Sequence, residues 1–291
     1  MNLIKMILKG VVIGIANAIP GVSGGTMMVS MGIYDKLIHA ITHLFSEFKK
    51  SMKLLLPILV GAALGVLILA ALIEKMFAVV PIQTNLLFIG LIVGGLPMMT
   101  KKVKDEKPNA ACIIGFIFFF ALVVGMAAMG EGESAAADVS FNMVNVIKLF
   151  GVGIVAAATM VIPGVSGSMM LMIMGYYETI ISTINDFVKA ALAFDMPAIL
   201  TSCSVLLPFG IGAVIGIAII AKLVEMVFEK FPNVAYWCII GLIVSSPIGI
   251  VLMNLDAFKA HMGIVAILTG IVALAIGGVI AFKLGGDEEE A

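Results

Sequence analysis

The feature that most constrains this chain is a Pro-Gly break inside an apolar stretch, and the break occurs twice. Residues 19–26 read IPGVSGGT, and residues 162–169 read IPGVSGSM. Proline cannot continue a helical hydrogen-bond ladder, and glycine tolerates a reversal of the chain. Between residues 19–38 and 162–181, 11 of 20 aligned positions are identical. Any fold for this chain must therefore contain two equivalent interruptions.

The similarity continues beyond the two motifs and divides the chain into homologous halves. LLPILVGAALG at 55–65 matches LLPFGIGAVIG at 206–216, and IGLIV recurs at 89–93 and 240–244. A linker of small and acidic residues separates these halves. We predict a first repeat at 1–130, a linker at 131–142, a second repeat at 143–284 and an acidic tail at 285–291.

Composition places both repeats in a membrane. The chain is 62% hydrophobic and 12% charged, whereas soluble domains are about 25% charged. Each half has three further apolar runs near the roughly 20 residues that a helix needs to cross a bilayer. The predicted spans are 54–73, 84–99 and 110–130 in the first half, and 203–221, 234–253 and 262–282 in the second.

The broken segments, 6–38 and 145–183, are predicted to form re-entrant helical hairpins. A continuous helix over 6–38 would be about 50 Å long, too long for one crossing of a roughly 30 Å core. We take each arm alone to be too short to cross. The predicted fold is an all-α polytopic membrane protein, in which each repeat has one re-entrant hairpin and three transmembrane helices.

Three crossings per repeat predict that the halves insert in opposite orientations. Lysines flank the first hairpin on both sides and recur in KKVKDEK at 101–107, which would be cytoplasmic. The nearly uncharged loop 74–83 and the acidic linker would be outside. We therefore predict inverted-topology repeats in a plasma membrane, with both termini cytoplasmic.

A helix that begins at such a break has unpaired N–H groups and a partial positive charge, so an anion is the expected guest. All 17 basic residues are lysines, so the two-pronged arginine contact is not available. Inverted-repeat transporters bind substrate where broken helices converge. The alternative is that the breaks are packing kinks. The candidate substrate-binding residues are Asn17, Pro20, Gly21, Ser23, Gly24, Gly25, Thr26, Pro163, Gly164, Ser166, Gly167 and Ser168.

Four carboxylates in matched positions are candidates for proton or sodium coupling, because acidic groups in membrane segments are functional candidates by default. These are Asp35, Glu74, Glu178 and Glu225. His39 and His43 share a helix face, but the sequence offers no obvious third ligand. We predict no metal, no cofactor and, at a net charge of −1, no nucleic-acid partner. Gly61-x-x-x-Gly65 and Gly212-x-x-x-Gly216 indicate close helix contacts, either within the subunit or in a homodimer.

The paired IPGVSGGT…GIY and IPGVSGS…GYY blocks resemble the polyprenyl-phosphate transport family, the PopT-type undecaprenyl-phosphate translocases. The resemblance covers nearly the whole chain. It implies a bacterial or archaeal plasma membrane and the return of undecaprenyl phosphate, the lipid carrier of cell-wall synthesis, to the inner leaflet. It implies that the two motifs bind the phosphate head while the tail stays among membrane lipids. The second copy departs from the first at Ser168 and Met169, where the first has Gly25 and Thr26.

Three other functions remain open at this stage. They are an ion-coupled transporter of a small soluble anion, a channel, and a membrane enzyme acting on polyprenyl phosphates. A channel needs a continuous polar pore, which the low charge content disfavours. The sequence has no nucleophile–base constellation and no clustered acidic metal ligands, so we predict that the chain is not an enzyme.

Overall fold

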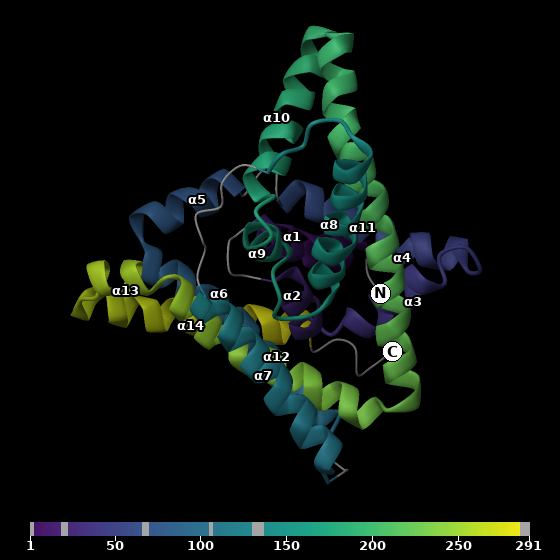
Figure 1. The fold of residues 1–291 in the computed structure, drawn as a ribbon. Coiled ribbons are helices and arrows are strands. Elements are labelled where there is room, and N and C mark those ends of the chain that lie inside the picture. The colour runs from purple at the N-terminus through teal and green to yellow at the C-terminus, as the bar shows by residue number, and fades with distance from the viewer. Residues whose placement is uncertain (1–2, 19–22, 66–69, 105–106, 130–136, 286–291) are drawn as a thin grey trace. The chain divides into compact units, whose positions relative to one another are not determined.

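The fold is known from a computed structural model, which describes residues 3–18, 23–65, 70–104, 107–129 and 137–285. All regular elements in these ranges are helices, and no strand occurs among them (Figure 1). This agrees with the predicted all-α class. The chain divides into two compact units, which we describe separately.

Unit 1 contains residues 1–130, 162–165 and 222–291. It therefore combines the whole first repeat with the end of the second. Its helices are α1 (Leu3–Ala18), α2 (Gly24–Ser30), α3 (Tyr34–Thr42), α4 (Phe48–Leu64), α5 (Ala70–Val79), α6 (Pro81–Lys101), α7 (Ala110–Met129), α12 (Pro232–Met253), α13 (Leu255–His261) and α14 (Ile264–Gly285).

Unit 2 contains residues 131–161 and 166–221. It holds α8 (Met143–Val161), α9 (Gly167–Ile173), α10 (Tyr177–Ala193) and, as far as Ala221, α11 (Met196–Lys230). Apolar side chains from α8, α10 and α11 meet in one small core around Leu149, Ile180 and Val205. Val152, Ala156 and Leu171 form a second core where α8 packs on α9.

The repeat in the sequence recurs in the local structure of both broken segments. Helices α2 and α9 begin directly after Ser23 and Ser166, whose backbones are extended with nearly equal angles (φ −97° and −95°, ψ 125° at both). Each short helix is followed by a glycine with positive φ, 68° at Gly32 and 78° at Gly175. Only glycine adopts this conformation without strain, so the glycines set where α3 and α10 start.

Helix pairing in unit 1 exchanges elements between the repeats. α6 of the first repeat packs along α14, and α12 of the second packs along α7 (Figure 1). Gly90 on α6 lies against the backbone of Leu274, and its counterpart Gly241 on α12 lies against the backbone of Phe116. Equivalent glycines therefore make equivalent close contacts, as small residues do between membrane helices. This exchange explains why unit 1 contains parts of both halves.

The matched small-residue motifs also pack within the subunit. A Cβ at Gly61 would overlap the carbonyl oxygen of Ile7 on α1, and one at Gly212 would overlap that of Phe150 on α8. The first contact joins α4 to α1 in unit 1, and the second joins α11 to α8 in unit 2. These motifs were expected to make helix contacts either within the subunit or in a homodimer, and the contacts seen here are within the subunit.

Six described helices are long and apolar enough to cross a membrane: α6, α7, α8, α11, α12 and α14. The predicted spans at 84–99, 110–130, 203–221, 234–253 and 262–282 fall on five of them, α6, α7, α11, α12 and α14, and α11 extends well beyond its span at both ends. The predicted span at 54–73 falls on α4, the start of α5 and residues 66–69 outside the described ranges. The sixth, α8, runs from Met143 to Val161. It is the first arm of the second broken segment, and its 19 residues make it longer than we assumed for such an arm.

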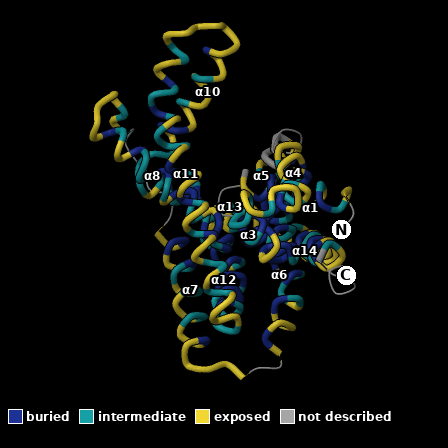
Figure 2. The backbone as a smooth tube through the Cα atoms, turned by 90° about the vertical axis from the view of Figure 1, so that its right-hand side faces the viewer, coloured by how far each residue is buried: buried dark blue, intermediate teal, exposed yellow. Residues whose placement is uncertain are grey.

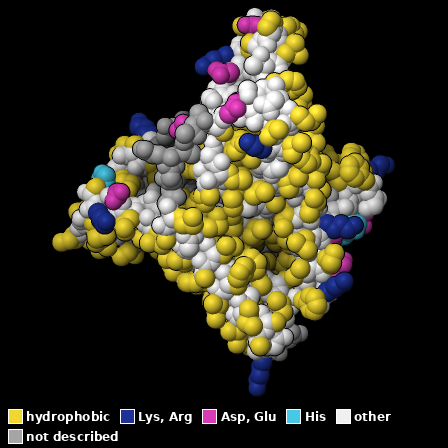
Figure 3. All heavy atoms as spheres, in the orientation of Figure 1, with side chains coloured by type: hydrophobic (Ala, Val, Ile, Leu, Met, Phe, Trp, Pro, Cys, Tyr) yellow, Lys and Arg dark blue, Asp and Glu magenta, His cyan; other side chains and the backbone are white. Residues whose placement is uncertain are grey.

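Burial separates central from peripheral helices. In the apolar windows of α6 and α12, 56% of residues are buried, against 17% in α7 and α14 (Figure 2). The exposed side chains of the peripheral helices are mostly Ile, Val, Leu and Phe. Hydrophobic side chains also dominate the face seen in Figure 3, where charged groups are few. Such a surface suits lipid, because hydrocarbon does not penalise exposed apolar groups.

Candidate functional site

The two sequence motifs meet in unit 1, although they are 143 residues apart in the chain. The N–H of Gly164 donates to the hydroxyl of Thr26 at 2.6 Å. Pro163 lies close to Gly25, because a Cβ added at Gly25 would be 3.1 Å from the Cα of Pro163. Thr26 and Pro163 are both buried. The first residues of α2 therefore form the surface on which the second break rests.

Ser23 has a buried hydroxyl at the start of α2. Its side chain is 7% exposed, and its Oγ has no hydrogen-bond partner among the described residues. A buried hydroxyl without a partner costs about 1–3 kcal/mol, so it needs an explanation. Two other buried polar atoms share this condition, Asn233 Oδ1 and Trp237 Nε1 on α12. Asn233 also lies in the first turn of its helix, but its Oδ1 can only accept, and Trp237 lies beyond that turn. Of these three atoms, the Ser23 hydroxyl is the one that combines a donor with the first N–H groups of a helix.

In the second copy of the motif, the hydroxyl of Ser166 has hydrogen-bond partners within the motif itself. Ser166 Oγ lies 2.7 Å from Ser168 Oγ and also accepts from the N–H of Met169 at 3.5 Å. The first copy has Gly25 in place of Ser168, so it cannot form this pair. A side chain at Gly25 would press on the backbone of Ile162 and Pro163. The same substitution that lets the motifs meet therefore leaves Ser23 available to a ligand.

The remaining candidate residues of the motifs have different surroundings. Asn17 is exposed at the end of α1, and its side-chain amide lies against Gly24. Gly24 and Gly167 are buried, and Gly164 has a positive φ of 80°. Pro20 and Gly21 lie outside the described residues.

Lys9 is a buried cation that the sequence analysis did not identify. It is 2% exposed, and its Nζ donates to the carbonyl oxygen of Met31 at 2.9 Å, where α2 ends. A cation at a helix C-terminus is favourable because the last carbonyl groups carry partial negative charge. The equivalent position in the second half is Val152. This difference between the two halves, lysine in the first and valine in the second, is the sequence signal that could have identified Lys9 as a candidate.

The candidate coupling carboxylates have different surroundings. Asp35 is exposed and accepts a hydrogen bond from the Tyr236 hydroxyl at 3.1 Å. Glu225 is contacted by His39 and His43. Glu178 is exposed in the first turn of α10, in unit 2. The side chain of Glu74 lies outside the described residues.

A groove of about 610 Å³ lies beside α3 and the start of α4 in unit 1. Three lysines line it, namely Lys36, Lys50 and Lys53, together with Asp35 and Glu47. Lys50 donates to Glu47 at 2.8 Å, and this hydrogen bond lowers the pKa of Glu47. Lysines and carboxylates therefore line this groove together, at the end of the first broken segment, and the ion pair between Lys50 and Glu47 lies within it.

Comparison with known proteins gives one family and two curated relatives. The profile of the family described as VCA0040-like, undecaprenyl phosphate translocase-like, matches residues 13–261. A polyprenyl-phosphate transporter of Staphylococcus aureus is 30% identical over 246 residues, covering 82% of this chain and 83% of that protein. A polyprenyl-phosphate transporter of Vibrio cholerae is 25% identical over 262 residues, covering 84% and 77%. No solved structure gives a significant match.

Proposed function

Because this chain belongs to the undecaprenyl phosphate translocase-like family, we propose that it transports a polyprenyl phosphate across a bacterial plasma membrane. Its relatives in two bacteria carry the name polyprenyl-phosphate transporter. The chemistry of such a lipid suits the chain. The phosphate monoester needs hydrogen-bond donors and positive charge, whereas the polyprenyl tail needs only an apolar surface. Six apolar helices supply the latter.

The observation that carries the proposal is the unpartnered, buried hydroxyl of Ser23. It lies at the start of α2, where the second motif rests on Thr26 and Gly25. A phosphate oxygen that accepts from Ser23 and from neighbouring N–H groups would remove the cost of the unpaired donor. Lys9, which lies at the other end of α2, contributes positive charge in a medium of low dielectric constant.

The transport cycle follows from two further parts of the proposal. The halves form inverted repeats, and the broken segments re-enter the membrane as hairpins. The head group is taken up at the outer leaflet, held between the motifs, and released to the inner leaflet when the halves rock past each other. This direction returns the lipid carrier for reuse in cell-wall synthesis. Coupling to protons or sodium through Asp35, Glu74, Glu178 or Glu225 belongs to the same proposal.

The test compares Ser23→Ala with wild type in liposomes that contain undecaprenyl phosphate. The accessibility of the head group to an external phosphate-binding probe reports its distribution between leaflets. We expect wild-type protein to redistribute the lipid and Ser23→Ala to slow this at least about tenfold, the effect of one lost hydrogen bond to a charged group. Ser23→Ala should unfold at the wild-type temperature or above it, because the hydroxyl has no partner among the described residues to lose and the cost of burying it is removed.

Ser182→Ala is the matched control, since this exposed hydroxyl bonds only to the carbonyl oxygen of Thr179 one turn away. It should transport at the wild-type rate. Equal rates for Ser23→Ala and Ser182→Ala would remove Ser23 from the site. Absence of redistribution by folded wild-type protein, under imposed proton and sodium gradients, would contradict lipid transport itself and favour a soluble anion. Release of inorganic phosphate would instead identify an enzyme.

A further inference from the structure

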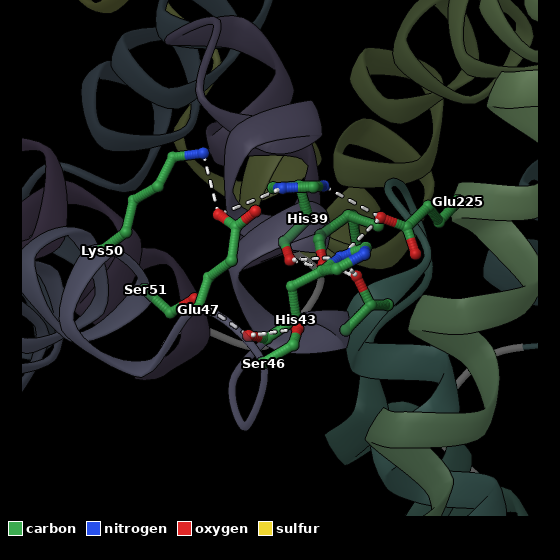
Figure 4. Close-up of polar contacts among 9 residues, drawn as sticks. His39, His43, Ser46, Glu47, Lys50, Ser51 and Glu225 are labelled. Atoms are coloured by element: carbon green, nitrogen blue, oxygen red, sulfur yellow. Dashed lines mark hydrogen bonds and ion pairs between the residues drawn. The ribbon is translucent and has the colours of Figure 1, made fainter.

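Three ligating side chains that are far apart in the sequence meet at one point in unit 1. His39 is in the last turn of α3, His43 directly follows that helix, and Glu225 is near the end of α11. The Nδ1 atoms of His39 and His43 lie 3.1 and 3.2 Å from the same carboxylate oxygen, Oε1 of Glu225 (Figure 4). The ligand atoms of all three residues lie within 4.8 Å of one another. This is the third ligand that the sequence did not reveal.

The spacing of these atoms fits a small tetrahedral ion. At zinc–nitrogen and zinc–oxygen distances near 2.0–2.1 Å, two ligand atoms of a tetrahedral site are about 3.3 Å apart. The two measured distances to Glu225 Oε1 are within a few tenths of an ångström of that value. Two imidazoles and one carboxylate are also a donor set that zinc accepts, leaving a fourth position for water.

The surroundings resemble the outer shell of a metal site. The other ring nitrogen of His39, Nε2, lies 3.8 Å from Glu47 Oε2. Histidines that bind metals usually present their second nitrogen to a carboxylate, which fixes the tautomer. Lys50 holds Glu47 in turn through an ion pair of 2.8 Å. The rings of His39 and His43 are stacked with centroids 4.2 Å apart. Both rings present Nδ1 to the same oxygen of Glu225.

The framework of the cluster is held by contacts that do not involve any ion. Phe228, one turn beyond Glu225, packs against Tyr34 of α3 and Tyr236 of α12, with ring centroids 6.3 and 5.2 Å apart. Tyr236 also donates to Asp35 on α3. A groove of about 290 Å³ opens beside His39 and Glu225. The side chains of His39 and Glu225 are 46% and 15% exposed. The ligands are therefore preorganised and reachable from solvent.

From this geometry we propose that His39, His43 and Glu225 bind one zinc ion, which fastens the end of α3 to α11. The ion replaces the contacts between the rings and the carboxylate, and each imidazole presents an unprotonated Nδ1 to it. The competing arrangement has no metal. In it, both rings donate to Glu225, and His43 Nδ1 also bonds to Thr42 Oγ1 and the His39 carbonyl oxygen, at 3.1 and 3.3 Å.

The experiment titrates zinc chloride into purified full-length protein that has been stripped with a chelator, in competition with a chromogenic zinc indicator. We expect one zinc per chain for wild type. His43→Ala and Glu225→Gln should abolish this stoichiometric binding, and Glu47→Gln should weaken it roughly 10- to 100-fold. His261→Ala is the matched control, because this third histidine of the chain is exposed on α13 and bonds only within its own helix.

A second measurement does not depend on how the variants fold. Zinc should raise the thermal unfolding temperature of wild-type protein, because the ion binds the folded state. Cobalt(II) in place of zinc should give the visible absorption of a tetrahedral site. Absence of stoichiometric zinc binding by wild type would overturn the proposal and leave the hydrogen-bonded arrangement. Equal affinity in wild type, His43→Ala and Glu225→Gln would overturn it as well, since the zinc would then be bound elsewhere.

Discussion

At the scale of single residues, the two copies of the motif differ in the hydrogen bonds that their hydroxyl groups make. Thr26 supplies the acceptor for Gly164, whereas its counterpart Met169 has no hydroxyl. Ser166 bonds with Ser168, whereas Ser23, with Gly25 at the corresponding position, has no hydrogen-bond partner in the described part of the chain. The first copy therefore supplies both the joint between the motifs and the free donor. If the motifs bind a phosphate as proposed, we expect the first copy to bind it more tightly than the second.

Thr26→Val should weaken the joint between the motifs. Valine has nearly the same shape but leaves the Gly164 N–H without an acceptor, which we expect to lower the free energy of unfolding by about 1 kcal/mol. Thermal or denaturant unfolding in detergent measures this. Thr26→Ser keeps the hydroxyl and should retain most of the stability. A valine variant as stable as the serine variant would show that the hydrogen bond contributes nothing.

The duplicated motif is what singles out Ser23, Thr26 and Gly164 as candidates in the sequence, and their role in binding stays a prediction. Two features of the structure left no comparable signal, for local reasons. Lys9 was missed because, together with Lys5, it was taken as part of a cytoplasmic flank. The third partner of His39 and His43 was missed because Glu225 is 182 residues beyond His43 and only packing brings it near. Ligands from distant segments leave no spacing pattern to read.

At the scale of elements, matched glycines decide which helices pair. Gly90 and Gly241 allow α6 to approach α14 and α12 to approach α7 until backbones touch. Five of the predicted spans fall on helices that are long and apolar enough to cross a membrane, since length and hydropathy can be read from the sequence. The sequence did not predict their partners, because contact between helices in lipid depends on shape rather than on hydrophobicity.

Gly90→Ala should separate α6 from α14. The added methyl group would overlap the carbonyl oxygen of Leu274, and backbone cannot move aside as a side chain can. We expect a loss of about 1–3 kcal/mol in the free energy of unfolding. Gly125→Ala on α7 is the control, because no atom lies within 4 Å of its added methyl group. If both variants unfold together with wild type, the close contact has no energetic importance.

At the scale of the whole molecule, the repeat predicts the topology in the membrane. Single cysteines on a background without the native Cys112, Cys203 and Cys238 can test it with a membrane-impermeant maleimide. We expect Ser140→Cys in the linker to react in intact cells, and Lys104→Cys to react only after permeabilisation. This follows from the lysine-rich segment before α7 and the acidic linker after it.

Cysteines on both flanks of the first broken segment separate a hairpin from a crossing. If the segment is re-entrant, Lys5→Cys and Lys49→Cys should both be protected in intact cells. Labelling of one flank from outside would show that the segment crosses, and the halves would then be parallel rather than inverted. Lys104→Cys is the control for sealed cells. Because it is predicted to be cytoplasmic, its protection in intact cells shows that the maleimide has not entered them.

The exchange of helices between the repeats also bears on how the protein is made. During synthesis α6 emerges long before α14, and α7 before α12, so neither early helix has its partner when it enters the bilayer. α7 gains its partner when α12 has been made, and α6 only when α14 has followed. The packing of unit 1 can therefore be completed only after the last helix is synthesised, and neither half on its own supplies the partners that unit 1 requires.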